Sequence, residues 1–129
     1  MMKYRERIAD KILKEKLEAK GAVLIEGAKW CGKTTTARQL AKSVLYMQDP
    51  AQKPQNLKLA EIQPSLLLEG ETPRLIDEWQ LAPSLWDAVR FEVDRRDQFN
   101  QFILTGSSAP IADMSTSHSG TGRISRMLM

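Results

Sequence analysis

The chain has 129 residues, of which 42% are hydrophobic, so its length fits one small domain with one buried core and excludes a second full domain. Its 19 Lys and Arg residues outnumber 16 Asp and Glu residues, but they are scattered along the chain and give only a weak sign of nucleic-acid binding, which needs clustered cations. Cys31 is the single cysteine, which excludes an intramolecular disulfide. No apolar run resembles a secretory signal or reaches the ~18 residues of a membrane span, so we expect a cytoplasmic protein without membrane association.

The first 21 residues predict an amphipathic helix that leads into the domain. Apolar residues recur on a charged background at three- to four-residue spacing, at Tyr4, Ile8, Ile12, Leu13 and Leu17. Gly21 follows in the position of a C-terminal helix cap. We expect the domain proper to cover residues 22–129 and to continue beyond Met129, because the last segment resembles the start of a further element.

The following segments alternate between predicted strands and helices. Strands are predicted over residues 22–26, 44–47, 74–78 and 101–108, and a fifth is predicted to begin in residues 123–129. Helices are predicted over residues 33–43 and 83–96, with two short ones between residues 50 and 70, of which the second starts at Pro64. This order predicts an α/β fold of three layers with a mainly parallel sheet, in which ligands bind at the carboxyl ends of the strands.

A glycine-rich segment, GAKWCGKTTT from Gly27 to Thr36, lies between the first predicted strand and the next helix and matches the P-loop pattern GxxxxGK[ST]. Glycines allow the backbone N–H groups to approach phosphates closely, and the start of a helix favours negative charge. Lys33 can reach the β- and γ-phosphates, and the hydroxyl of Thr34 can bind Mg²⁺. The predicted phosphate-binding residues are Gly27, Ala28, Lys29, Trp30, Cys31, Gly32, Lys33, Thr34 and Thr35.

Three of these loop residues have less defined roles. Trp30 and Cys31 occupy variable positions of the pattern and are expected to set the shape of the loop. Thr35 either helps to hold the α-phosphate or packs within the helix.

The predicted strand RLIDE ends in two carboxylates and resembles a Walker B element. Asp77 is predicted to hold hydrated Mg²⁺, and Glu78 to polarise a water for in-line attack on the γ-phosphate. Neighbouring residues of a strand point to opposite faces, so both carboxylates can serve one site only if the strand ends there. The acidic pair favours water over another acceptor as the nucleophile.

Two further groups are candidates for contact with the γ-phosphate. Ser107, at the tip of the strand FILTGSS, is the first candidate to bind the attacking water or the γ-phosphate, with Thr105 as the second, and a merely polar strand exit is the alternative. This strand is expected to lie between the P-loop strand and the acidic strand. Arg123 and Arg126 follow a segment of loop composition, and an arginine aimed at the γ-phosphate accelerates transfer, although a structural role is the alternative.

Together, the segments AVLIEGAKWCGKTTTA, LIDEWQLAPSLWDAVR, FILTGSSAP and GTGRISRM resemble those of prokaryotic AAA-type ATPases, loosely called archaeal-ATPase-like proteins. Members of this family carry an N-terminal P-loop domain and a C-terminal domain of unknown function. The resemblance covers nearly the whole chain and implies an AAA-like P-loop NTPase fold that uses ATP and Mg²⁺. It assigns Gly27 to Thr34 to Walker A, Asp77 and Glu78 to Walker B, LTGSS to the sensor region and Gly122 with Arg123 to a glycine-arginine element.

The sequence therefore predicts a Mg²⁺-dependent ATPase that hydrolyses the γ-phosphate with water. Two other functions are left open. One is a nucleotide-dependent switch with little hydrolysis that contacts DNA or a partner protein, and the other is a phosphotransferase. Assembly into a homo-oligomer is left open as well.

Overall fold

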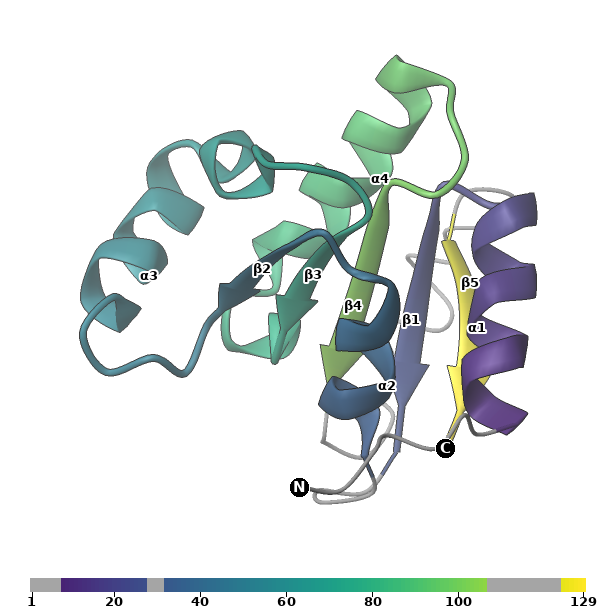
Figure 1. Ribbon diagram of the computed structural model, residues 1–129. Coiled ribbons are helices and arrows are strands. Elements are labelled where there is room, and N and C mark those ends of the chain that lie inside the picture. Colours follow the sequence, from purple (N-terminus) through teal and green to yellow (C-terminus); the bar gives the residue numbers. More distant parts are fainter. Residues whose placement is uncertain (1–7, 28–31, 107–123) are drawn as a thin grey trace.

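The computed structural model describes residues 8–27, 32–106 and 124–129. The strands in this part of the chain are β1 (Ala22–Glu26), β2 (Ser43–Tyr46), β3 (Arg74–Asp77), β4 (Phe102–Gly106) and β5 (Ile124–Leu128). They form one sheet in the order β2-β3-β4-β1-β5, and each pair of neighbours is parallel (Figure 1). The sheet predicted from the alternating segments is confirmed.

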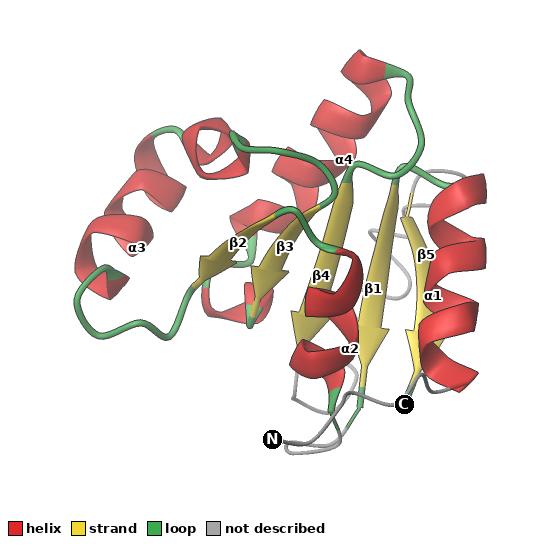
Figure 2. Ribbon diagram, viewed as in Figure 1, coloured by secondary structure: helices red, strands yellow, loops and turns green. Residues whose placement is uncertain are grey.

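Helices cover both faces of the sheet, with α1 and α2 on one face and α4 on the other (Figure 2). The described helices are α1 (Ile8–Ala19), α2 (Lys33–Leu40), α3 (Lys53–Ile62) and α4 (Ser84–Arg96), together with the 3₁₀ turns η1 (Pro64–Leu68) and η2 (Trp79–Leu81). The two short helices expected between residues 50 and 70 correspond to α3 and η1, and η1 does begin at Pro64. None of the helices in the described residues is long and apolar enough to cross a membrane.

The alternation of side chains along β1 divides the core into two halves. Val23 and Ile25 face α1 and α2, and pack in a cluster that includes Leu13, Leu17, Ala37, Leu75, Ile103 and Met127. Ala22 and Leu24 face α4 and pack in a cluster that includes Ile76, Leu85, Trp86, Val89, Phe102 and Leu104. Residues 22–25 are at most 2% exposed. Burial on both faces thus explains why this strand has no polar alternation.

The apolar face predicted for the first helix is only partly correct. Leu13 and Leu17 are buried, but Ile8 and Ile12 are 79% and 38% exposed. Tyr4 lies outside the described residues. The helix therefore contacts the sheet through the later part of the expected stripe.

Gly21 follows α1 as expected, but it does not adopt the left-handed conformation that favours glycine at a helix cap, because the glycines with positive φ in the described part of the chain are Gly32 and Gly70. Packing explains the glycine instead. A Cβ atom at Gly21 would lie 2.1 Å from Cγ1 of Val93 in α4. A side chain at this position would therefore collide with α4, which lies on the face of the sheet opposite α1.

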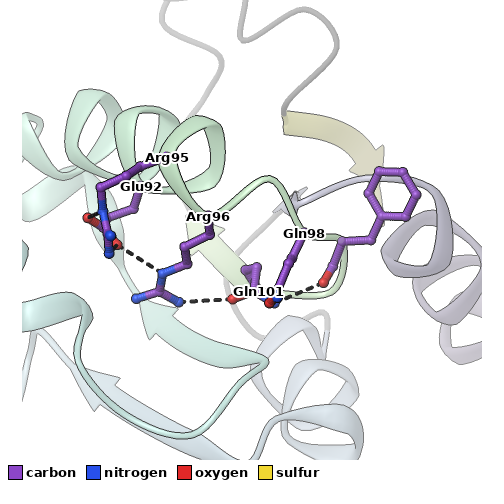
Figure 3. A network of polar contacts seen from close by, with 6 residues as sticks. Glu92, Arg95, Arg96, Gln98 and Gln101 are labelled. Carbon is purple, nitrogen blue, oxygen red and sulfur yellow. Dashed lines mark hydrogen bonds and ion pairs between the residues drawn. The ribbon is translucent and has the colours of Figure 1, made fainter.

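A polar network ties the end of α4 to the start of β4 (Figure 3). Glu92, which is 8% exposed, accepts hydrogen bonds of 2.9 Å from Arg95 and from Nε of Arg96. Arg96 also donates to Oε1 of Gln101 at 3.0 Å, and its guanidinium lies 4.9 Å from the ring centroid of Phe102. The hydrogen bonds from Arg95 and Arg96 lower the pKa of the Glu92 carboxyl below its ordinary value, although burial works in the opposite direction.

Candidate nucleotide-binding site

The residues predicted to bind phosphate and metal lie at one edge of the sheet. β1, β3 and β4 all end at this edge, and α2 begins there (Figure 1). The strand β4 lies between β1 and β3, as expected, and its register places Gly106 beside Glu26 on one side and Thr105 beside Asp77 on the other. The sheet therefore brings the P-loop strand, the expected sensor strand and the acidic strand together.

The described ends of the P-loop have the geometry that the motif requires. Gly32 precedes α2 with φ 95° and ψ 15°, a left-handed conformation that a residue with a side chain rarely adopts. Lys33 is 5% exposed, and its Nζ donates to the carbonyl of Gly27 at 3.0 Å. The lysine side chain thus reaches back across the loop to its first residue. Ala28, Lys29, Trp30 and Cys31 lie outside the described residues, so their phosphate contacts stay predictions.

Asp77 connects the acidic strand to two other elements. Its Oδ1 accepts a hydrogen bond of 2.7 Å from the Thr34 hydroxyl in α2 and another of 2.7 Å from the Thr105 hydroxyl in β4. Asp77 is 9% exposed and Thr105 is fully buried. The carboxylate is therefore held in one orientation at the start of α2, where a bound triphosphate is expected.

The oxygen atoms of Thr34 and Asp77 fit a Mg²⁺ ion. The described residues contain no group of three or more His, Cys, Asp and Glu side chains that could hold a metal by themselves. Mg²⁺ does not need such a group, because it is commonly bound by one or two protein oxygens together with waters and substrate phosphates. A hydroxyl and a carboxylate at the head of a phosphate-binding helix supply such a donor set.

The backbone turns sharply after Asp77. β3 ends at this residue, and Glu78 adopts φ 59° and ψ 51°, a left-handed conformation that is uncommon for a glutamate. Its N–H donates to the Thr105 hydroxyl at 3.2 Å, and its carboxylate accepts a hydrogen bond from the Gln80 amide. The strand therefore ends at Asp77, which is the condition for both carboxylates to serve one site. Asp77 and Glu78 lie at the same edge of the sheet.

Thr105 has a different place from the one expected of a sensor. Its hydroxyl donates to Asp77 and accepts from the backbone of Glu78, so it holds the two acidic residues together. Neither this contact nor the bond from Gln80 to Glu78 was predicted. The available signals were a threonine near the end of the strand next to the acidic one, and a glutamine two residues beyond the acidic pair.

Other predicted residues lie apart from these contacts or outside the described chain. Thr35 is exposed on α2. Arg126 lies within β5, where its guanidinium is 3.7 Å from the Glu26 carboxylate and 5.7 Å from the ring centroid of Trp86, so its described contacts are structural. Ser107 and Arg123 are not among the described residues, and their catalytic roles stay predictions.

A parallel sheet with this strand order, a glycine loop between β1 and α2, and an acidic pair at the end of β3 define a P-loop nucleoside triphosphatase fold. The chain belongs to the AAA domain family, which it matches over residues 19–129. It is therefore a nucleotide-binding, ATPase-like module.

Two relatives are similar to nearly the whole chain. One is an uncharacterized protein of Mycobacterium tuberculosis and the other an uncharacterized protein of Mycobacterium bovis, each 33% identical over 125 residues. The match covers 95% of this chain and 28% of each relative, so the chain spans less than a third of their length. No solved structure matches the chain.

Proposed function

We propose that the chain binds ATP together with Mg²⁺ and hydrolyses the γ-phosphate with water as the nucleophile. The observation that carries this proposal is the position of Asp77, whose Oδ1 lies 2.7 Å from both the Thr34 and the Thr105 hydroxyl oxygens. These bonds connect the phosphate-binding helix to a strand end that also carries Glu78. A loop that only bound phosphate would not need a second, buried carboxylate next to the metal ligand.

In this proposal Thr34 and Asp77 hold the metal, and Lys33 binds the β- and γ-phosphates. When bound, Mg²⁺ would neutralise charge on the phosphate oxygens during transfer. Lys33 has the reach for its part, because its Nζ already lies 3.0 Å from the carbonyl at the opposite end of the loop. Its ammonium exchanges this carbonyl for phosphate oxygens when nucleotide binds.

Glu78 is proposed as the general base. It follows the metal carboxylate directly, and its backbone is fixed by the hydrogen bond to Thr105 and by the left-handed turn. Glu78 is 9% exposed, so its carboxylate acts in a site with little bulk water. It accepts the proton of the attacking water, and this makes that water a better nucleophile.

The experiment that tests this function is the substitution Glu78→Gln. It should leave the affinity for ATP within about twofold but reduce the turnover number about 100-fold or more, because only the proton acceptor is lost. Release of inorganic phosphate and binding of an ATP analogue are measured on the same preparation. Glu61→Gln, at an exposed position of α3, is the matched control. Turnover in Glu78→Gln equal to that of the parent chain would exclude Glu78 as the base, and transfer of labelled phosphate to a metabolite would support the phosphotransferase instead.

A further inference from the structure

Gln80 lies in the 3₁₀ turn η2, two residues after the proposed base. Its Nε2 donates a hydrogen bond to Oε2 of Glu78. A carboxylate only accepts hydrogen bonds, so the amide must present its nitrogen to Glu78 and direct its oxygen elsewhere. The orientation of the Gln80 amide is therefore determined by its neighbour.

The oxygen of this amide is buried and has no hydrogen-bond partner within the described part of the chain. It lies against the end of β4, where a Cβ atom built on Gly106 would be 3.0 Å away from it. Gly106 follows Thr105, the residue that binds Asp77 and the backbone of Glu78. A buried acceptor without a donor is unfavourable, and at a functional site it calls for a donor that arrives with a ligand.

The separation between this oxygen and the proposed base is that of two groups bridged by one water, which would enter when nucleotide binding opens the buried oxygen to solvent. The nitrogen and oxygen of one amide are about 2.2 Å apart, so Oε1 of Gln80 lies within about 5 Å of the Glu78 carboxylate. Two hydrogen bonds of about 2.8 Å each can span such a separation. One water can therefore donate to both acceptors.

We propose that Gln80 positions the nucleophilic water for Glu78, an inference that rests on the proposed hydrolysis of ATP. The amide nitrogen holds the carboxylate, and the amide oxygen accepts the second hydrogen of the water, so that a lone pair of the water is directed at the γ-phosphorus. In the reaction the water oxygen bonds to phosphorus, the bond from phosphorus to the bridging oxygen of ADP breaks, and one water proton passes to Glu78. The products are ADP and inorganic phosphate.

The first test is Gln80→Leu, which keeps most of the side-chain volume but removes the amide. We expect kcat to fall about 10- to 100-fold while the affinity for a non-hydrolysable ATP analogue stays within about twofold, because the amide acts on the water and not on the nucleotide. Affinity for ADP with aluminium fluoride, which includes the attacking water, should fall about tenfold or more. Gln55→Leu, at an exposed position of α3, is the matched control.

The second test is Gln80→Met, which keeps the length of the side chain but removes the amide. We expect kcat and the affinity for ADP with aluminium fluoride to fall as in Gln80→Leu. A glutamine that only supported the fold would leave both unchanged in a folded variant. This test also decides the question if Gln80→Leu does not fold, as judged from its thermal unfolding.

The outcomes separate the two proposals. If Glu78→Gln loses turnover while Gln80→Leu hydrolyses ATP and binds the fluoride complex as the parent chain does, the role of Gln80 is overturned and the proposed function stands. If Glu78→Gln retains full turnover, Glu78 is not the base and the role of Gln80 fails with it. If the parent chain itself releases no phosphate from ATP, the proposed function fails.

Discussion

The hydroxyl of Thr34 donates a hydrogen bond of 2.7 Å to Oδ1 of Asp77, although the two residues are 43 positions apart in the sequence. The bond joins the first turn of α2 to the end of β3. Because β4 lies between β1 and β3, this contact depends on the pairing of β1 with β4 and of β4 with β3. The phosphate loop and the acidic strand are consequently parts of one site before any nucleotide binds.

Replacing Thr34 with valine should remove the metal dependence of nucleotide binding. Valine has nearly the shape of threonine, but it can neither bind Mg²⁺ nor hold Asp77. We expect Mg²⁺ to bind at least about 10- to 100-fold more weakly in the presence of an ATP analogue, because losing a ligand costs no less than losing a group that supports a ligand. The measurement is the affinity for the analogue in Mg²⁺ and in EDTA. The ratio of these two affinities should approach one in Thr34→Val.

Thr34→Ser is the matched control, since it keeps the hydroxyl and should preserve the dependence on Mg²⁺. A strong Mg²⁺ effect in Thr34→Val would show that the hydroxyl of this residue is not a metal ligand.

Thr105→Val should impair both stability and turnover. The Thr105 hydroxyl is fully buried, donates to Asp77 and accepts from the N–H of Glu78, so its loss leaves that N–H without this partner. The free energy of unfolding should fall by about 1–3 kcal/mol, the range for an unsatisfied buried polar group. Urea denaturation measures this loss, and phosphate release measures turnover. Thr105→Ser should keep most of both, and a valine variant as stable and active as the parent would mean that Thr105 does not position the acidic pair.

The sheet and its ligand-binding edge could be predicted because they depend on local patterns. The apolar run before Gly27, the P-loop spacing and the acidic end of RLIDE each carry a signal within a few residues. The contacts of Thr105 and Gln80 could not be predicted in the same way. They depend on the register that sets Thr105 beside Asp77 and on the left-handed turn at Glu78, and neither is encoded by spacing along the chain.

Gly21 illustrates the same limit in the fold. A glycine after a helix predicts a cap, because local statistics favour that explanation. The structure requires a glycine at this position since α4, far along the chain, places Val93 within 2.1 Å of where a Cβ would lie. A contact between segments far apart in the sequence therefore explains the glycine at position 21.

Gly21→Ala should destabilise the fold through this contact. The added methyl must displace Val93 or the backbone, and overpacking of this kind costs about 1–3 kcal/mol. The double variant Gly21→Ala with Val93→Ala provides the room, so its loss in the free energy of unfolding should be smaller than the sum of the two single losses. Urea unfolding of all four chains gives the coupling. Additive losses would show that the collision with Val93 is not the cause.

Glu92→Gln should change how stability depends on pH. The hydrogen bonds from Arg95 and Arg96 lower the pKa of Glu92 in the folded chain, so the carboxylate stabilises the fold wherever it is already ionised in the unfolded chain, above about pH 4.3. This contribution is lost as the pH falls through that value and then through the lower pKa of the folded state. The parent chain should therefore exceed Glu92→Gln in stability by the largest margin near neutral pH, and the margin should shrink below about pH 4.

The measurement for Glu92 is the free energy of unfolding in urea at several pH values between 3 and 7, for the parent chain, Glu92→Gln and the exposed control Glu61→Gln. The control should follow the parent at every pH, because residue 61 lies on the exposed side of α3 and the described structure shows no ion pair for it. If the difference in stability between the parent chain and Glu92→Gln did not change with pH, the charge on the Glu92 carboxylate would not contribute to that difference. The network at the end of α4 would then stabilise the fold by packing, with Arg96 held over Phe102 regardless of the charge on residue 92.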